Sequence, residues 1–266
     1  MTIITPEEQK QIMLDMLEFI DKTCRQNGIK YSLFAGSLIG AIRHQGYIPW
    51  DDDIDIVLTK ENYTKLKTIL DKGTGRYQTL KFGRGGEQFS FLKLVDTHTG
   101  LKEPSQAKPI PDYGIFIDIF CYYPAPNDAK LRKKHFKRVQ LLVSLIARRK
   151  LSLNASPKQN FLRLGKNTLS KILGYKHINK MFAKTMNRYK NTDYVMTSWP
   201  AYAYEKEIQL AKNTEDYIDA KFENLTVMIF KNYDAILSTT FGDYMQLPPP
   251  EARKPRHTLE MWWREK

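Results

Sequence analysis

The most constraining feature of this sequence is a run of aspartates that leads directly into an apolar segment, DDDIDIVL over residues 51–58. The apolar residues 54–58 predict a β-strand, and alternate residues of a strand face the same side of a sheet. The carboxylates of Asp53 and Asp55 are therefore expected to converge on one point, with Asp51 beside them. Carboxylates this close repel one another unless a cation lies between them, so the pattern predicts a site for Mg²⁺ or Mn²⁺. An exposed acidic loop is the alternative interpretation.

A Gly-Ser pair precedes the acidic run. Residues 31–34 predict a short strand, Gly36-Ser37 the turn after it, and residues 37–43 a short helix. Glycine lets a backbone approach a phosphate closely, and Ser37 offers a hydroxyl and an N–H group at a helix start, where anions bind. The order of strand, Gly-Ser, short helix and acidic strand resembles the nucleotidyltransferase fold.

A third carboxylate is expected from Asp118, which lies among apolar and aromatic residues in GIFIDIF, residues 114–120. A buried acid in such a segment is costly without a cation. A strand residue that alternates toward water is the other interpretation. The sequence leaves open whether Asp118 is a third metal ligand or the base that activates an acceptor.

The remaining periodicity predicts an α/β (α+β) chain with a small mixed sheet flanked by helices. Residues 5–8, TPEE, are typical of a capped helix start, and Asn27-Gly28 of its end. Further strands are expected at residues 89–95, 114–120 and 225–230, and helices at 61–70, 131–150, 161–173, 178–189 and 233–241; residues 73–86 read as a loop or hairpin. We divide the chain into a catalytic core at 1–128, a basic helical subdomain at 129–192 and a C-terminal part at 193–266 that completes the core.

Charge is distributed very unevenly. The net charge is +13, yet residues 129–192 hold 18 Lys or Arg and no Asp or Glu, while the rest holds 24 basic and 29 acidic residues. One block therefore carries the whole basic excess, which indicates an anionic partner such as a membrane face or a phosphate-rich polymer. Its first helix combines an apolar stripe with flanking basic residues, the pattern of an interfacial helix; a solvated basic face is the alternative. The stripe comprises Leu131, Val139, Leu142, Val143 and Ile146, and the basic residues are Lys133, Lys134, Lys137, Arg138, Arg148 and Arg149.

Several classes of protein are disfavoured. The two cysteines, Cys24 and Cys121, form no CxxC or zinc pattern and no disulfide framework. The N-terminus lacks the features of a secretory signal, and no stretch approaches 18 uncharged apolar residues. We expect a cytoplasmic protein with peripheral contact at the inner face of the membrane.

Three segments resemble the LicD family of phosphocholine transferases, which is related to fukutin. They are FAGSLIGAIRHQGYIPWDDDID at 34–55, residues 230–245, and LPPPEARKPRH at 247–257. The resemblance implies Mg²⁺-dependent transfer of phosphocholine from CDP-choline to a sugar hydroxyl of a lipid-linked or polymeric anionic glycan, such as a teichoic acid precursor, with release of CMP. It implies that Asp53 and Asp55 bind the metal and that basic side chains contact phosphate or nucleotide. The candidates for those contacts are Arg43, Lys93, Arg253 and His257, beside Gly36 and Ser37.

Choline would need aromatic faces, because a quaternary ammonium group cannot donate hydrogen bonds. The candidates are Trp50, Trp199, Tyr202, Tyr204, Trp262 and Trp263. Two other functions remain open: a nucleotidyltransferase that modifies a small molecule, and a basic protein that binds nucleic acid. The second is disfavoured because the charge is not interleaved with a known nucleic-acid-binding pattern, and we expect no nucleic-acid partner.

Overall fold

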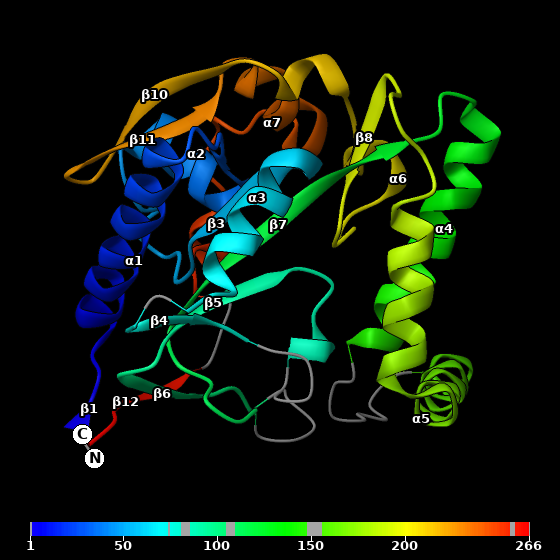
Figure 1. Ribbon diagram of the computed structural model, residues 1–266, viewed down its shortest axis with the longest axis horizontal. Helices are drawn as coiled ribbons and strands as arrows, with labels where there is room; N and C mark the ends of the chain where they lie inside the picture. Colours follow the sequence, from blue (N-terminus) through cyan, green and yellow to red (C-terminus); the bar gives the residue numbers. More distant parts are fainter. Residues whose placement is uncertain are drawn as a thin grey trace.

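The structure, a computed structural model, describes residues 2–73, 75–80, 86–104, 110–147, 156–255 and 259–265. Within these ranges the chain forms a seven-stranded mixed sheet in the order β2-β3-β7-β5-β4, in which β8 also pairs with β7 and β9 with β8 (Figure 1). The strands are β2 (Ser32–Leu33), β3 (Asp55–Thr59), β4 (Tyr77–Thr79), β5 (Leu92–Asp96), β7 (Phe116–Ala125), β8 (Tyr194–Thr197) and β9 (Ile208–Leu210). The predicted α+β class with a mixed sheet is confirmed.

Strand β7 is the central strand of this sheet, because its 10 residues pair with three different neighbouring strands. Its first residues pair with β5 in antiparallel orientation, its middle pairs in parallel with β3, and its last residues, from Tyr122 to Ala125, pair with β8. The predicted strand at 114–120 was therefore too short at its C-terminal end. The extension matters because it carries the sheet from the acidic residues to a second hydrophobic core, which it shares with residues 136–146.

Helix α1 (Pro6–Gln26) begins and ends where the sequence predicts. The Thr5 side chain accepts a hydrogen bond from the Glu8 backbone, the Glu8 carboxylate accepts one from the Thr5 N–H group, and the helix ends at Asn27. This reciprocal capping satisfies backbone donors that a helix start would otherwise leave unpaired. Helices α2 (Ala35–His44), α3 (Lys60–Leu70) and α7 (Tyr233–Phe241) also form as predicted, to within a few residues.

The basic segment forms two helices, α4 (Ala129–Ile146) and α5 (Pro157–Met186). Gly174, with φ of 71°, interrupts α5 and separates the two helices that the sequence predicts there. The predicted apolar stripe of α4 faces the protein, not the solvent. Four of its members pack in a second hydrophobic core against β7, β8 and the last turns of α5, and Leu131 alone is exposed. The buried members are Val139, Leu142, Val143 and Ile146. The interfacial-helix interpretation of α4 was therefore wrong.

Other elements escaped the sequence interpretation. A three-stranded sheet joins β1 (Thr2–Ile3), β12 (Glu260–Trp263) and β6 (Thr99–Lys102). The strand β10 (Tyr217–Phe222) was not predicted either; it forms a hairpin with β11 (Leu225–Phe230), which confirms the strand predicted at 225–230. Helix α6 (Tyr204–Glu207) and three short 3-10 helices, Gly86–Gln88, Ala211–Thr214 and Pro250–Ala252, complete the described elements. Among the described residues, no helix combines the length and apolarity needed to span a membrane.

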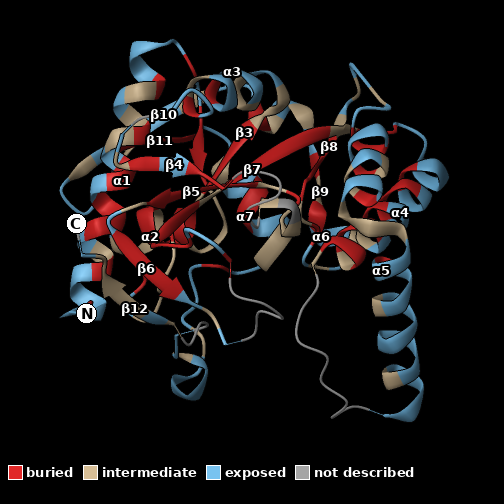
Figure 2. Cartoon of the chain, turned by 60° about the horizontal axis from the view of Figure 1, so that its bottom comes forward, coloured by how far each residue is buried: buried red, intermediate tan, exposed pale blue. Residues whose placement is uncertain are grey.

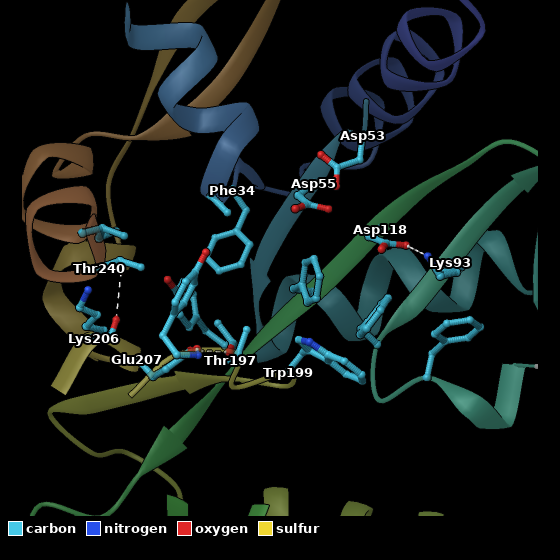
Figure 3. A pocket seen from close by; sticks show the side chains of 18 of the residues that line it. Phe34, Asp53, Asp55, Lys93, Asp118, Thr197, Trp199, Lys206, Glu207 and Thr240 are labelled. Atoms are coloured by element: carbon cyan, nitrogen blue, oxygen red, sulfur yellow. Dashed lines mark hydrogen bonds and ion pairs between the residues drawn. The ribbon is translucent and has the colours of Figure 1, made fainter. Parts of the chain in front are cut away.

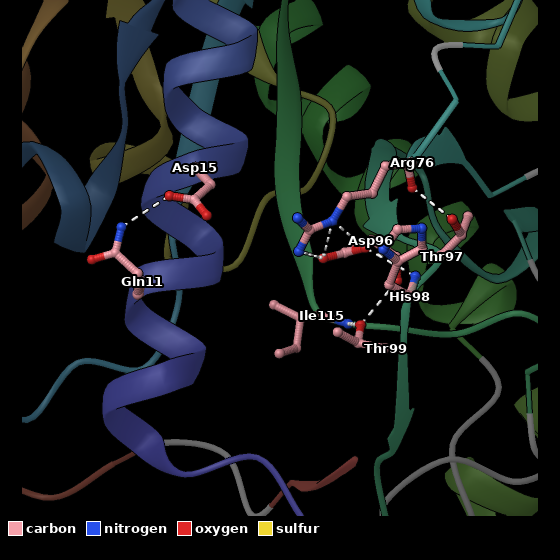
Figure 4. Close-up of polar contacts among 8 residues, drawn as sticks. All are labelled: Gln11, Asp15, Arg76, Asp96, Thr97, His98, Thr99 and Ile115. Atoms are coloured by element: carbon pink, nitrogen blue, oxygen red, sulfur yellow. Dashed lines mark hydrogen bonds and ion pairs between the residues drawn. The ribbon is translucent and has the colours of Figure 1, made fainter. Parts of the chain in front are cut away.

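A buried ion pair fixes the corner where β5 leads into β6 (Figure 4). The Asp96 carboxylate is fully buried and accepts hydrogen bonds from the Arg76 guanidinium at 2.6–3.0 Å and from the His98 N–H group. The Thr99 hydroxyl donates to the Asp96 carbonyl and accepts from the Ile115 N–H group. A paired and hydrogen-bonded charge can stay buried, so this corner holds β5 in place beside β7.

Candidate active site

A cavity of about 240 Å³ opens beside the middle of β7, where the acidic residues of β3 meet it. Figure 3 shows acidic side chains on one side of this cavity, Glu207 on the other, and aromatic rings between them. Its walls come from the start of α2 and from β3, β5, β7, β8, α6 and α7. The lining includes Phe34, Asp53, Asp55, Phe91, Lys93, Phe116, Asp118, Phe120, Tyr122, Thr197, Trp199, Tyr202, Glu207 and Phe241.

The acidic side of the cavity comes from two neighbouring strands. Asp55 opens β3 and lies directly opposite Asp118 of β7 in the parallel pair. Asp53 precedes Asp55 by two residues and lines the same cavity. Asp51, Asp52 and Asp53 can also each offer a carboxylate oxygen within 4.8 Å of the others. Asp53 therefore belongs both to the cavity wall and to the acidic cluster before the strand.

Crowded negative charge changes the chemistry of Asp55. Its pKa is raised well above the ordinary value, first by burial and then by the negative charges of Asp53 and Asp118, with Asp51 adding to the effect. Lys93 opposes this shift. Burial and like charges both disfavour the ionised form of a carboxyl group. A cation placed among these oxygens would relieve the repulsion that raises this pKa.

Lys93 lies at the edge of the acidic cluster. Its Nζ atom donates to Asp118 Oδ1 at 2.5 Å, across the antiparallel pair of β5 and β7. The same ammonium group lies 3.3 Å from the centroid of the Phe116 ring, and the Lys93 side chain is only 4% exposed. A buried ammonium group needs such a carboxylate and such ring faces. Lys93 thus brings one positive charge into a strongly negative site.

The Gly-Ser pair lies within the first turn of α2, not in a turn before the helix. Ala35, with φ of 45°, makes the bend into the helix. A Cβ atom on Gly36 would lie 2.4 Å from a carboxylate oxygen of Asp51, so glycine permits that close approach. The Ser37 hydroxyl accepts a hydrogen bond of 2.9 Å from the Asp55 N–H group. Both residues thereby position the acidic run.

Aromatic rings form the floor of the cavity. Phe116, Phe120 and Tyr122 alternate along β7 on the face that carries Asp118, as the two-residue period of a strand requires. The Phe91 ring contacts the Phe120 ring at 4.5 Å between centroids and the Trp199 ring, edge on, at 5.3 Å. Phe34 packs against Phe120 and Tyr122, and Tyr202 against Phe241. The alternation around Asp118 was a readable signal for these rings.

Glu207 is the functional candidate that sequence interpretation missed. It ends the four-residue helix α6, and it is 6% exposed. Its carboxylate accepts hydrogen bonds from the Tyr202 N–H group at 2.6 Å and from the Thr197 hydroxyl at 3.1 Å. The pKa of this carboxyl group is raised above its ordinary value by burial, and these two donors only partly offset that effect. No local pattern announces Glu207, because its burial depends on β8 and α7, which lie elsewhere in the sequence.

Only some of the basic residues predicted to contact phosphate lie at the cavity. Lys93 lines the cavity, whereas Arg43 and Arg253 are absent from its lining. The Arg43 guanidinium donates to the backbone carbonyls of Tyr244 and Gln246, and burial together with the charge of Arg253 lowers its pKa. Arg253 donates to the Pro248 carbonyl, and its guanidinium lies 5.6 Å from the Trp50 ring. His257 lies outside the described residues.

The predicted choline-binding aromatics are also divided. Trp199 and Tyr202 line the cavity, and the other four do not. The Trp50 ring packs against the main core and Arg253. Tyr204 packs against Phe136 and accepts a hydrogen bond from Arg132 in the helical subdomain. Trp262 and Trp263 belong to β12, where the Trp262 ring covers the backbone of Gly100.

Comparison with known proteins shows which proteins this chain is similar to. Residues 28–140 match the profile described as LicD/FKTN/FKRP, nucleotidyltransferase domain. The chain is also 29% identical to the lipopolysaccharide cholinephosphotransferase LicD of Haemophilus influenzae, over 97% of this chain and 98% of that protein. Residues 28–140 are therefore similar to the nucleotidyltransferase domain of the LicD family. An uncharacterised Rickettsia prowazekii protein, RP689, is 47% identical over 60 residues, which is 23% of this chain and 21% of that protein.

The part of the chain that matches the LicD-family profile contains the acidic half of the cavity. Asp53, Asp55, Lys93 and Asp118 all fall within residues 28–140, whereas Glu207 lies beyond them. Trp199 and Tyr202 also come from the later part of the chain. The similarity to the Haemophilus influenzae protein extends over nearly the whole length of both proteins. The recognised domain therefore supplies the carboxylates, and the C-terminal part of the chain closes the cavity around them.

Proposed function

We propose that this protein transfers phosphocholine from CDP-choline to a sugar hydroxyl of a cell-surface glycan, with release of CMP. The observation that carries the proposal is the juxtaposition of an acidic cluster with an aromatic cavity that ends in a buried carboxylate, Glu207. The two halves of phosphocholine suit the two parts of this site. Its phosphate would bind together with a metal cation at the acidic residues, and its quaternary ammonium group would bind in the aromatic cavity. The name of the Haemophilus influenzae relative supports the same choice of transferred group.

The donor set of the acidic cluster fits a hard divalent ion. Asp51, Asp52 and Asp53 can bring carboxylate oxygens together, and Asp55 interacts electrostatically with Asp53 and Asp118. Carboxylate oxygens are the ligands that Mg²⁺ and Mn²⁺ prefer. The repulsion that raises the pKa of Asp55 would be relieved by such an ion. In this proposal Asp53 and Asp55 hold the ion. When bound, it would neutralise charge on the donor phosphates and orient them for in-line displacement.

The chain's own residues then have distinct tasks. Lys93 holds Asp118 in position and offers a positive charge to the donor phosphates. The acceptor oxygen forms a bond to the phosphorus of phosphocholine as the bond to the CMP oxygen breaks. The hydroxyl proton passes to a carboxylate of the cluster. The apolar floor of the cavity limits water near the phosphorus, which favours a sugar hydroxyl as the acceptor.

The aromatic side of the cavity suits the choline head. Ring faces of Trp199, Tyr202 and Phe91 attract a methylated cation by about 0.5–2 kcal/mol each, and they need no hydrogen bond from it. Glu207 adds a negative charge that such a cation can balance. The cavity is smaller than the roughly 300–1,000 Å³ of a pocket that encloses a drug-sized ligand, so it suits the phosphocholine end and leaves cytidine outside.

The test uses two forms of CDP-choline, one labelled in the choline methyl groups and one in the cytidine ring. Each is incubated with the protein, Mg²⁺ and a lipopolysaccharide or teichoic acid precursor, with and without EDTA. We expect only the choline label to enter the acceptor, and EDTA to stop its entry. Entry of the cytidine label would instead indicate a nucleotidyltransferase, and entry that EDTA leaves unchanged would refute the proposed metal.

A further inference from the structure

The first half of α5 has an unusual relation to the rest of the protein. Beyond Gly174 the helix changes direction, and Figures 1 and 2 show residues 157–173 extending from the body with most of their surface exposed. The second half, by contrast, buries Ile178, Phe182 and Met186 in the second hydrophobic core. The two halves of one helix therefore meet different surroundings.

The polarity of this half-helix is inverted. Its large apolar side chains face outward: Phe161 and Ile172 are each 76% exposed, and Leu162, Leu164 and Leu169 are 42–53% exposed. Although Leu173 packs, partly buried, against the second hydrophobic core, the side turned to the protein is mostly polar. It carries Asn160, Asn167 and Ser170, and the buried Ser170 hydroxyl donates to the Leu145 carbonyl of α4. A helix that packs only on its own protein would show the reverse arrangement.

The exposed apolar residues form one stripe. Phe161 and Ile172 are eleven residues apart, which is three helical turns, and Leu169 lies about a turn from Ile172. Lys166 and Lys171 lie on the two sides of this stripe, Lys158 lies within it in the first turn, and residues 129–192 contain no acidic residue. An apolar stripe flanked by lysines matches the boundary between anionic lipid headgroups and acyl chains.

We infer that residues 157–173 of α5 dock on an anionic phospholipid bilayer, with Phe161 and Ile172 inserted into the interface. The positive charge of the segment favours an anionic bilayer over a second copy of this chain, because a second copy would bring the same excess of basic residues to the contact. The inference is independent of the proposed function. It also moves the membrane contact away from α4, whose apolar stripe is buried.

The first experiment measures sedimentation with vesicles of phosphatidylcholine alone or mixed with phosphatidylglycerol. The test variant is Phe161→Gln/Ile172→Gln, and the matched control is Leu131→Gln/Leu141→Gln, which removes two exposed apolar side chains from α4. Glutamine keeps the helix propensity. We expect the parent and the control to bind the anionic vesicles, and the α5 variant to bind about a hundredfold less, since each inserted side chain contributes about tenfold.

A second experiment reports depth directly. The two native cysteines are buried, so Ile172→Cys can be labelled with a polarity-sensitive dye, with Leu141→Cys as the control. We expect a blue shift on anionic vesicles at position 172 and none at position 141. Equal binding of the α5 variant and the parent, equal losses in both glutamine variants, or water-like emission at 172 on pelleted vesicles would each overturn the inference. So would a lipid-free dimer that the α5 substitutions dissociate while vesicle binding is absent.

Discussion

The ion pair of Lys93 and Asp118 offers the sharpest test of how the acidic site is held together. The two side chains are 4% and 14% exposed, and the distance between Nζ and Oδ1 is 2.5 Å. Replacing Lys93 by methionine keeps the length of the side chain and removes its charge. Asp118 would then face Asp55 across the parallel strands with no ammonium group to offset the repulsion.

The expected cost follows from burial. Removing one partner of a buried ion pair costs about 3–5 kcal/mol, because the other charge stays buried without compensation. Lys93→Met and Asp118→Asn should each destabilise the fold by about that amount. The double variant should cost much less than the sum, since it leaves neither charge behind. The coupling energy of the cycle should therefore be at least about 2 kcal/mol.

Urea unfolding at neutral pH, with EDTA and then with Mg²⁺, measures this cycle. In Mg²⁺ we expect the Lys93→Met variant to recover more stability than the parent, because Asp118 becomes available to a cation that binds the native state. Additive losses in the two single variants would show that the pair is not coupled. A loss below about 1 kcal/mol in each would show that solvent reaches both groups, contrary to their burial.

Three further predictions concern the site and the fold. Asp53→Asn and Asp55→Asn should each lower kcat at least about a hundredfold while circular dichroism stays unchanged, because metal positioning supplies several kcal/mol; near-normal turnover in both would exclude their role. In competition assays, Trp199→Leu should weaken the binding of CDP-choline more than the binding of CDP-ethanolamine, whereas Glu207→Gln should raise KM for both cationic donors. Equal losses of affinity for both donors in Trp199→Leu would exclude the ring as a selector of methyl groups. Burial and two nearby arginines lower the pKa of His135 to about 4 from an ordinary value of 6.5, so the unfolded chain binds the proton more tightly than the folded one. The contribution of His135 to stability should be full above about pH 6.5 and fall by up to about 3 kcal/mol toward pH 4. In thermal melts, His135→Phe should flatten this pH dependence.

Much of the core was predictable because its signals are local. The capping box of α1 involves residues three positions apart, and the alternation in β3 and β7 needs only the two-residue period. The predicted helix start and the presence of both strands are confirmed, although β7 extends five residues beyond the predicted end. The three-stranded sheet was not predictable in this way, since β1 and β12 are two and four residues long and pair across nearly the whole chain. Such strands carry too little pattern to be recognised.

The site residues could likewise be predicted only where their signals are local in the sequence. The association of Asp55 with Asp118 followed from two strands with acidic residues, although their parallel pairing needed the structure. Lys93 was expected to contact phosphate, and its bond to Asp118 depends on the register of β5, which no local pattern determines. Glu207 could not be predicted as a site residue, because a glutamate in a four-residue helix is usually exposed, and here packing against β8 buries it. Long-range packing thus decides which charged residues enter the cavity.

Helix α4 connects the cavity to the proposed membrane contact. Its Leu145 carbonyl accepts the hydrogen bond from Ser170 of α5, and two residues later Ala147 lines the cavity. A bilayer under α5 would therefore lie close to the wall of the cavity, and an acceptor anchored in the same leaflet would be concentrated there. The Phe161→Gln/Ile172→Gln variant should then raise KM for a lipid-linked acceptor in anionic vesicles. With a short soluble acceptor its kcat and KM should match the parent, because neither side chain lines the cavity. An unchanged KM for the lipid-linked acceptor would mean that docking and acceptor capture are separate events.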